Sequence, residues 1–531
     1  MKSAYNTNMN SETQSQSSYW VDIVCDAIEA KHPSGNLRVC SGISPSGPYH
    51  IGHTREVLTA DAVLRGLIRR GRKVDHIHFV DDFDALRKRY PYLPEKYEDE
   101  VGKPLYLVPA PDGKAESYAD QYFGEYQEAI KQLGVEMTVV RIHKEYQKGT
   151  FSKYISISLE RRDEIAAILE EVSGRAVDTD WQPVQILDAS NNNLRTAKFI
   201  EFDKSSGKVK YLGAGNTEYQ ADIHKGQVKL DWRVHWPAWW SIWGNQVEGF
   251  GREHATKGGS YDTGVEIARK IFGREAPYPV PYETINLKGE TKKMSSSLGN
   301  LVSIKDALSV IPPEVLRYFT FKSRPERQLF FDTGLGLYNL IDEYAKTESE
   351  TLAGNSPEFK EAWQISSLSG RDHVVSTVPF SHLVSCYQTA RGEKEEIFAL
   401  LNRSGHAEAV KLQKSAIEKE LTYLEKWLDS YAPDNIKFEV LQSAPELRLN
   451  ETQKEFITQL LAKLTSQEFM ADIIHGTIYD VAVTTGLGGK EAFTLIYQIF
   501  IGKDSGPRAG YFLSSLGKEF VIARLEEILK A

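Results

Sequence analysis

Apolar residues follow two different periods along the first 150 residues. They recur at helical spacing over residues 19–31 and 117–133, and they alternate with polar residues over 74–80 and 135–142. Strands that alternate with helices are typical of an α/β domain, in which helices cover a mostly parallel sheet. The sequence therefore predicts an α/β domain with an open parallel sheet in this part of the chain.

The pattern changes twice after this domain. Residues 154–171 have the spacing of one helix, whereas residues 178–219 lose any period and contain Asn, Gly and short β-like pieces, which indicates an inserted module. From about residue 341 the spacing is almost wholly helical, and two sets of residues near the C-terminus show it: Phe456, Ile457, Leu460, Leu461 and Leu464, then Phe520, Val521, Leu525, Ile528 and Leu529. We expect a helical domain without chemistry of its own, whose role is recognition.

The size and composition of the chain are those of a multidomain globular protein. With 531 residues the chain exceeds what one hydrophobic core usually supports, so we expect two to four domains. The formal charge of −9 does not by itself indicate a polyanionic partner. A local basic surface can still bind one, because charges act over about a Debye length. Composition therefore leaves a nucleic-acid partner open.

Cysteine usage and the N-terminus indicate a cytoplasmic protein. The three cysteines (Cys25, Cys40 and Cys386) form no C-x-x-C pair, which argues against a disulfide framework and fits a reducing compartment. The sequence contains no run of about 18 apolar residues, so we predict no membrane span. Residues 1–18 are polar and lack the apolar core of a signal peptide, so we expect a disordered tail.

Residues 41–62 form the first stretch with the pattern of a ligand site. A short strand is followed by a Gly/Pro/Ser turn and by His50, Gly52 and His53, where helical spacing begins. The unpaired N–H groups and the dipole of a helix N-terminus attract anions, and two imidazoles can add hydrogen bonds to phosphate oxygens. The alternative is an ordinary strand-turn-helix in which a histidine caps the helix.

A second candidate stretch lies at residues 288–300, KGETKKMSSSLGN. Gly, Ser and Lys crowd it and no apolar period is present, so we expect a mobile loop. The ammonium of Lys293 could follow the charge that develops on a leaving pyrophosphate. Alone, the stretch could equally be a solvated basic turn. It follows the earlier motif His50-Ile51-Gly52-His53 (HIGH) in the chain, and the two motifs in this order are more informative than either one alone.

Two further stretches carry candidate chemistry. Asp82 and Asp84 follow the strand predicted at 74–80, so they could meet a cation beyond the carboxyl end of the sheet, although aspartates also favour turns and caps. Five tryptophans lie between Trp232 and Trp243; most of them should pack the core, and one or two should touch ligand. A glycine turn then runs through Gly251 and Glu253, which suits a nucleotide or amino-acid contact.

These motifs together resemble a known family. HIGH followed by KMSSS resembles the two signatures of class I aminoacyl-tRNA synthetases. Over roughly residues 19–531, the order and spacing of the motifs resemble the class I lysyl-tRNA synthetases of the archaeal type: HIGHTREV, FVDDFDALRK, LDWRV with WPAWW, HATKGGSYDTG, PYE, KMSSS with GN, and GPRAGYFL.

The resemblance implies a domain organisation. The segments would be a disordered tail (1–18), a Rossmann-type doubly wound catalytic domain in two parts (19–150 and 229–284), an inserted module (151–228), the KMSKS loop with a stem-contact domain (285–350), and an α-helix cage that binds the anticodon (351–531).

The resemblance also implies substrates and site residues. ATP, usually with Mg²⁺, would react with L-lysine to give lysyl-adenylate, and tRNA(Lys) would accept the lysyl group; no membrane or DNA partner is expected. Catalysis would rest on His50, His53 and Lys293, and the predicted ATP contacts are His50, Gly52, His53, Gly251, Glu253, Lys293, Met294, Ser295, Ser296 and Ser297. The predicted lysine contacts are Gly42, Ser44, Trp232, His254 and Tyr282, with Asp82 and Asp84 added on charge grounds.

The sequence departs from the family at three places. Ser296 stands where the KMSKS signature has its second lysine, and Leu298 replaces a further lysine. The inserted module lacks the two C-x-x-C pairs common in the family, so we predict no structural zinc and a module held by packing. His235 replaces an aspartate of RVDWP, which would retune the amino-acid pocket.

Two other functions stay open from sequence. One is a class I ligase for glutamate, cysteine or arginine; a glutamate pocket would need a basic partner, whereas the candidate residues are acids and aromatics. The other is an inactive tRNA-binding paralogue, whose usual sign would be a broken HIGH motif. Both histidines of that motif are present.

Overall fold

A computed structural model describes residues 19–289, 302–368 and 373–530 of the chain. The chain divides into two compact units. The first holds the described residues up to Ile304 together with Thr320–Phe330, and the second holds Lys305–Phe319 and the described residues from Phe331 onward. None of the helices in the described ranges combines the length and the apolarity that crossing a membrane requires.

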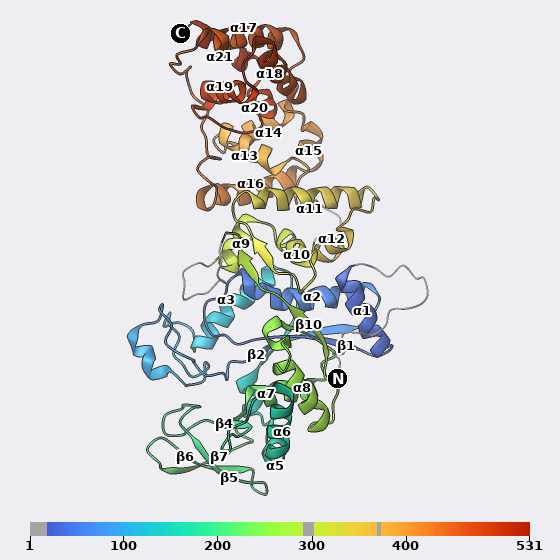
Figure 1. The fold of residues 1–531 in the computed structure, drawn as a ribbon, viewed down its shortest axis with the longest axis vertical. Coiled ribbons are helices and arrows are strands. Elements are labelled where there is room, and N and C mark those ends of the chain that lie inside the picture. Colours follow the sequence, from blue (N-terminus) through green and yellow to red (C-terminus); the bar gives the residue numbers. More distant parts are fainter. Residues whose placement is uncertain (1–18, 290–301, 369–372, 531) are drawn as a thin grey trace. The chain divides into compact units, whose positions relative to one another are not determined.

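A five-stranded parallel sheet forms the centre of the first unit (Figure 1). Its strands lie in the order β10 (Tyr278–Tyr282), β9 (Val247–Gly251), β1 (Leu37–Ile43), β2 (Val74–Val80) and β3 (Thr138–Arg141). From β1 the chain winds to one side through β2 and β3 and later to the other through β9 and β10, with every pairing parallel. The predicted doubly wound parallel sheet is thereby confirmed, and ligands of such sheets bind beyond the carboxyl ends of the strands.

Helices cover both faces of this sheet. The described α-helices between residues 20 and 270 are α1 (Trp20–Lys31), α2 (Thr54–Arg69), α3 (Tyr118–Gln132), α4 (Ile142–Gln147), α5 (Ser152–Glu160), α6 (Arg162–Ser173), α7 (Trp232–Trp243) and α8 (Ser260–Lys270). Neighbouring residues of β2 show the two faces, because side chains alternate along a strand. The His78 ring lies against Tyr126 of α3, whereas the Phe79 ring stacks on Trp239 of α7 at 4.6 Å between centroids.

The predicted helix over residues 154–171 is two helices, α5 and α6, separated at Arg161. The Arg161 guanidinium donates to the carbonyl oxygens of Lys270 and Ile271, at 3.1 and 3.0 Å, and so satisfies carbonyl groups at the end of α8. Hydrophobic periodicity cannot predict this contact, because the two segments lie far apart in the sequence. The strand predicted over 135–142 is likewise shorter, because β3 is an edge strand that pairs only where β2 lies beside it.

The inserted module contains two small antiparallel sheets. One joins β4 (Val184–Ile186) to β8 (Val228–Leu230), and the other has the order β5 (Lys198–Asp203), β6 (Lys208–Leu212) and β7 (Glu218–Asp222). Short β-like pieces were predicted here. Further short elements are three 3₁₀ turns, η1 (Ile51–His53), η2 (Glu95–Glu100) and η3 (Arg252–Ala255), and then β11 (Ile285–Leu287), α9 (Ile304–Val310), α10 (Pro313–Phe321) and β12 (Leu329–Phe331).

The second unit is helical from residue 336 onward, as predicted (Figure 1). Its helices are α11 (Gly336–Leu352), α12 (Lys360–Ser366), α13 (Phe380–Thr389), α14 (Lys394–Arg403), α15 (Ala407–Leu412), α16 (Lys414–Ser430), α17 (Glu451–Ser466), α18 (Ala471–Thr485), α19 (Gly489–Ile501), α20 (Ala509–Leu516) and α21 (Lys518–Lys530). The core near the C-terminus contains Phe456, Ile457 and Leu460 of α17 together with Val521 and Leu525 of α21. Phe520, from the same predicted set, is 38% exposed.

Candidate active site

A cavity of about 710 Å³ opens at the carboxyl ends of the central strands of the first unit. Its volume lies in the range of small-molecule sites. Eleven residues predicted from sequence line it: Gly42, Ser44, His50, Gly52, His53, Asp84, Trp232, Gly251, Glu253, His254 and Tyr282. Asp82 does not line it, and residues 293–297, which include Lys293, Met294, Ser295, Ser296 and Ser297, lie outside the described residues.

The two histidines of the HIGH motif are held in one orientation by the backbone. His50 Nδ1 accepts a hydrogen bond from Gly52 N, and His53 Nδ1 accepts one from His50 N, each at 3.0 Å. A Cβ at Gly52 would lie 2.7 Å from the His50 ring, so only glycine fits there. Because each Nδ1 accepts, the proton of each neutral ring resides on Nε2. Both rings therefore present an N–H donor of the kind that a phosphate oxygen accepts.

Glu56 is one of the cavity residues that the sequence prediction missed. Its Oε1 accepts from Gly42 N at 2.7 Å and its Oε2 accepts from the Tyr282 hydroxyl. Burial raises the pKa of Glu56 to about 8, although both hydrogen bonds oppose the shift. One signal was present in the sequence: Glu56 lies three residues after His53, which puts it on the same face of a helix whose other residues there are mostly apolar.

The tryptophan-rich helix α7 holds a second buried carboxylate of the cavity, which β9 contributes. Trp236 and Trp240 donate their indole N–H groups to Glu248 of β9, at 2.8 and 2.6 Å. Burial raises the pKa of Glu248 to about 7. Trp232, Trp236 and Trp239 line the cavity, and the Trp232 ring lies 5.8 Å from that of His254. Packing thus accounts for part of the cluster, as expected, while three of the five rings border the cavity.

The structure corrects the prediction that Asp82 meets a ligand cation. Asp82 is fully buried, and its carboxylate accepts from Arg141 Nε and His143 Nδ1 at 2.6 Å each. Arg141 ends β3 and His143 belongs to α4, so the Asp82 carboxylate is already paired with residues of the fold. Two residues apart in a turn, Asp82 and Asp84 face different surroundings.

Asp84 lines the cavity but pairs with a lysine of the chain itself. Lys229 Nζ lies 2.5 Å from Asp84 Oδ1 and 3.1 Å from Asp81 Oδ1. Burial would raise the pKa of Asp84, but the attraction of Lys229 outweighs it and lowers that pKa. Burial raises the pKa of the neighbouring Asp81 to about 7. The sequence signal for Lys229 was a lone lysine in the apolar run VKL.

His235 lies behind the cavity wall. It is fully buried, its Nδ1 is 2.8 Å from the Tyr146 hydroxyl, and burial lowers its pKa well below the ordinary value. His235 does not line the cavity, but its ring lies against those of Trp232 and Trp239, which do.

A carboxylate joins two loops of the inserted module, in the regions where the resemblance led us to look for cysteine pairs. Asp188 is fully buried, and it accepts from Ser190 Oγ at 2.7 Å, from Thr196 Oγ1 at 2.6 Å and from Ala214 N at 2.8 Å. The donor set is hydroxyls and an amide, which do not fit zinc. The module was expected to be held by packing; this polar cluster adds a link between its two loops.

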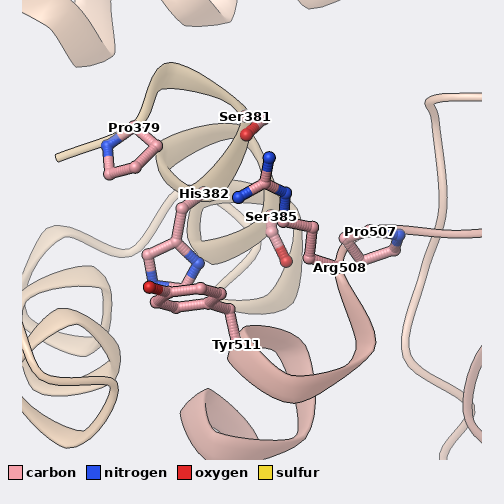
Figure 2. A pocket seen from close by; sticks show the side chains of 7 residues that line it. All are labelled: Pro379, Ser381, His382, Ser385, Pro507, Arg508 and Tyr511. Carbon is pink, nitrogen blue, oxygen red and sulfur yellow. The ribbon is translucent and has the colours of Figure 1, made fainter. Parts of the chain in front are cut away.

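A much smaller cavity lies in the helical unit, between α13 and the start of α20 (Figure 2). Pro507, Arg508 and Tyr511 of the GPRAGYFL motif line it, facing His382 and Ser385 of α13. Its volume is about 20 Å³, which is room for one water molecule. The Ser385 hydroxyl is buried without a protein partner and suits such a water. We assign no ligand to this cavity.

Comparisons with known proteins agree with this geometry. A family model described as "tRNA synthetases class I (K)" matches residues 18–372, and one described as "Anticodon binding domain" matches residues 396–529. A lysine–tRNA ligase of Archaeoglobus fulgidus is 38% identical, covering 96% of this chain and 100% of the relative. Those of Methanosarcina barkeri and Pyrococcus horikoshii are 38% and 34% identical over 96% of this chain and 97% and 99% of theirs. The chain therefore belongs to the class I (K) family of tRNA synthetases, an aminoacyl-tRNA synthetase family that includes these lysine–tRNA ligases.

Proposed function

We propose that this protein is a lysine–tRNA ligase that forms lysyl-adenylate from ATP and L-lysine and transfers the lysyl group to tRNA(Lys). The observation that carries the proposal is one cavity that is lined both by two oriented imidazole donors and by a buried carboxylate. The names of the full-length relatives support the choice of lysine.

In the first step the lysine carboxylate attacks the α-phosphorus of ATP and pyrophosphate leaves. No protein nucleophile is needed, so the chain contributes positioning and charge stabilisation. His50 and His53 donate from Nε2 to phosphate oxygens. Glu253, which lines the cavity with Gly251, would hold Mg²⁺ brought by ATP, and this ion neutralises phosphate charge when bound. Lys293 and Ser295–Ser297 keep their predicted role as a clamp on the triphosphate.

We further propose Glu56 as the acid that meets the lysine ammonium. Asp81 and Asp84 already share Lys229, and Asp82 lies outside the cavity, whereas Glu56 has no cation among its described partners, Gly42 and Tyr282. Those two partners are themselves predicted lysine contacts. A bound ammonium favours the charged form of a carboxylate and would lower the pKa that burial has raised.

Pyrophosphate exchange with ATP, measured with each of the twenty amino acids, tests the function. Exchange that depends on lysine alone is expected. Exchange with glutamate, cysteine or arginine in place of lysine would assign another ligase of the class, and no exchange with any amino acid, for protein that binds tRNA, would indicate an inactive paralogue.

A further inference from the structure

Two arginines lie at the mouth of the active-site cavity on the side of β2. Arg87 follows β2 in the chain, and Arg195 comes from the inserted module. Both line the cavity with exposed side chains, and Arg195 Nη1 lies 3.3 Å from the backbone carbonyl oxygen of Arg87. Among the residues that the structure describes, neither guanidinium has a carboxylate within salt-bridge distance. Both remain available to an anion from outside.

The charge of this end of the cavity is positive. Asp81 and Asp84 are its acids, and Lys229 already pairs with both. Lys229, Arg87 and Arg195 supply three positive charges against at most two negative ones. Two guanidinium groups side by side suit the oxygens of phosphate groups, which accept from their N–H forks.

The loop that carries Arg195 is fixed on the catalytic domain. Asn193 Nδ2 donates to Val101 O at 2.8 Å, and Leu194 N donates to Gly102 O at 2.9 Å. At its base the carboxylate of Asp188 holds Ser190 and Thr196. The loop is anchored on both sides of Arg195. Because this fixes Arg195 beside Arg87 in advance, little conformational entropy is lost when a ligand binds.

The order of the strands separates these arginines from the predicted nucleotide contacts. Gly251 ends β9 and Glu253 comes just after it, the two histidines follow β1, and Arg87 follows β2. The sheet has the order β9-β1-β2. ATP is thus expected over β9 and β1. In the second step of the proposed reaction, the 3′ ribose of tRNA must reach the lysyl carbonyl while the nucleotide still fills that end. The anionic strand then enters from the β2 side.

We propose that Arg87 and Arg195 bind backbone phosphates of the single-stranded 3′ end of tRNA at the mouth of the cavity. The proposal rests on the proposed function, because it assigns the place of the second substrate. It gives the inserted module a direct part in the transfer step.

The test uses full-length protein with both arginines replaced, R87Q/R195Q. The KM for tRNA in lysyl transfer should rise roughly five- to tenfold, as expected for the loss of two exposed charge contacts. The salt dependence of tRNA binding should weaken by about 0.7 in log–log slope per lost contact, the value for single strands. The KM for ATP in lysine-dependent pyrophosphate exchange should change by less than about twofold.

Two further variants make the outcome specific. R195K keeps the positive charge at residue 195 but not the forked guanidinium. Its affinity for tRNA should lie between those of R87Q/R195Q and wild type, and its salt slope should equal that of wild type. R175Q, which replaces another exposed arginine of the same unit that does not line the cavity, should match wild type.

A raised KM for ATP with unchanged KM for tRNA would overturn the proposal in favour of a triphosphate contact. An unchanged salt slope in R87Q/R195Q would overturn it outright. Absence of exchange in wild-type protein would instead refute the proposed function.

Discussion

At the scale of single residues, the cavity owes its chemistry to groups whose protons are positioned by neighbours. The backbone N–H of Gly52 and that of His50 determine which nitrogen of each imidazole carries hydrogen. Burial raises the pKa of Glu56 to about 8 and that of Glu248 to about 7, so both carboxylates hold their protons to a higher pH than an exposed glutamate does. A cationic ligand can therefore change the charge of the site when it binds.

Replacing His53 by alanine should slow adenylate formation. The His53 ring lines the cavity with its Nδ1 already used, so the variant loses a preoriented donor to phosphate. We expect the activation barrier to rise by about 2–4 kcal/mol, measured as kcat/KM in lysine-dependent pyrophosphate exchange. H224A is the matched control, because His224 is exposed and lies outside the cavity. Exchange at the wild-type rate in H53A would refute the role of His53.

Replacing Glu56 by glutamine should change how stability depends on pH. The pKa of Glu56 is raised by burial from 4.5 to about 8, so the folded state keeps a proton that the unfolded state releases between these values. Wild-type stability therefore falls as pH rises from about 4.5 to about 8, and glutamine removes that contribution. The Tm of E56Q relative to wild type should increase from pH 5 to pH 8.

The exposed Glu95 provides the control for this measurement. E95Q should show the same Tm difference from wild type at both pH values. A Tm difference for E56Q that also stays constant from pH 5 to pH 8 would show that Glu56 is ionised throughout.

At the scale of elements, long-range polar contacts decide details that local patterns cannot. Arg161 ends α5 because its side chain satisfies the carbonyl end of α8, about a hundred residues later. In the inserted module the carboxylate of Asp188 links Ser190 to Ala214 across two loops. These links add to the hydrophobic packing of the module, whose Val209, Tyr211 and Ile223 side chains are buried in the core of the first unit.

Replacing Asp188 by asparagine should loosen the inserted module. Hydrogen bonds from Thr196, Ser190 and Ala214 outweigh burial and lower the pKa of Asp188, so its stabilisation is present near neutral pH and is lost as pH falls through that lowered pKa. We expect D188N to cost about 1–3 kcal/mol at pH 7, with faster hydrogen exchange confined to residues near 188–214.

Asp203 offers a matched control, because it accepts from Ser205 and Ser206 in an exposed turn. D203N should leave exchange in the module unchanged. Purified wild-type protein should contain less than one zinc per chain, and a chelator should not reproduce the effect of D188N. Stoichiometric zinc would contradict this account of the module.

At the scale of the whole molecule, we expect activation and recognition to belong to different units. The cavity lies wholly in the first unit, and the helices that the anticodon-binding model matches, residues 396–529, lie in the second. A chain ending at residue 372 retains the range matched by the synthetase model. We expect it to keep lysine-dependent exchange and to lose tRNA charging, both measured on the same preparation. Charging at wild-type efficiency would refute a recognition role for the helical domain.

The sequence by itself determined most elements of the central sheet and its helices, and part of the cavity. Helical and alternating periods located α1, α2, α3, β1 and β2, because these patterns reflect which face of each element is buried. Eleven residues predicted from sequence line the cavity, and four of them belong to the HIGH and PYE motifs. The six-segment division and the roles of residues 293–297 stay predictions.

Only the tertiary structure decided how the charges are used. Asp82, Asp84 and Glu56 are all acids near strand ends or helix starts in the sequence. In the structure Asp82 pairs with Arg141 and His143, and Asp84 pairs with Lys229. Glu56 lines the cavity and accepts hydrogen bonds from Gly42 and Tyr282. The partners lie up to 226 residues away in the chain. Periodicity reports which side of an element is buried, whereas ion pairing depends on which distant side chain the fold brings within about 3 Å.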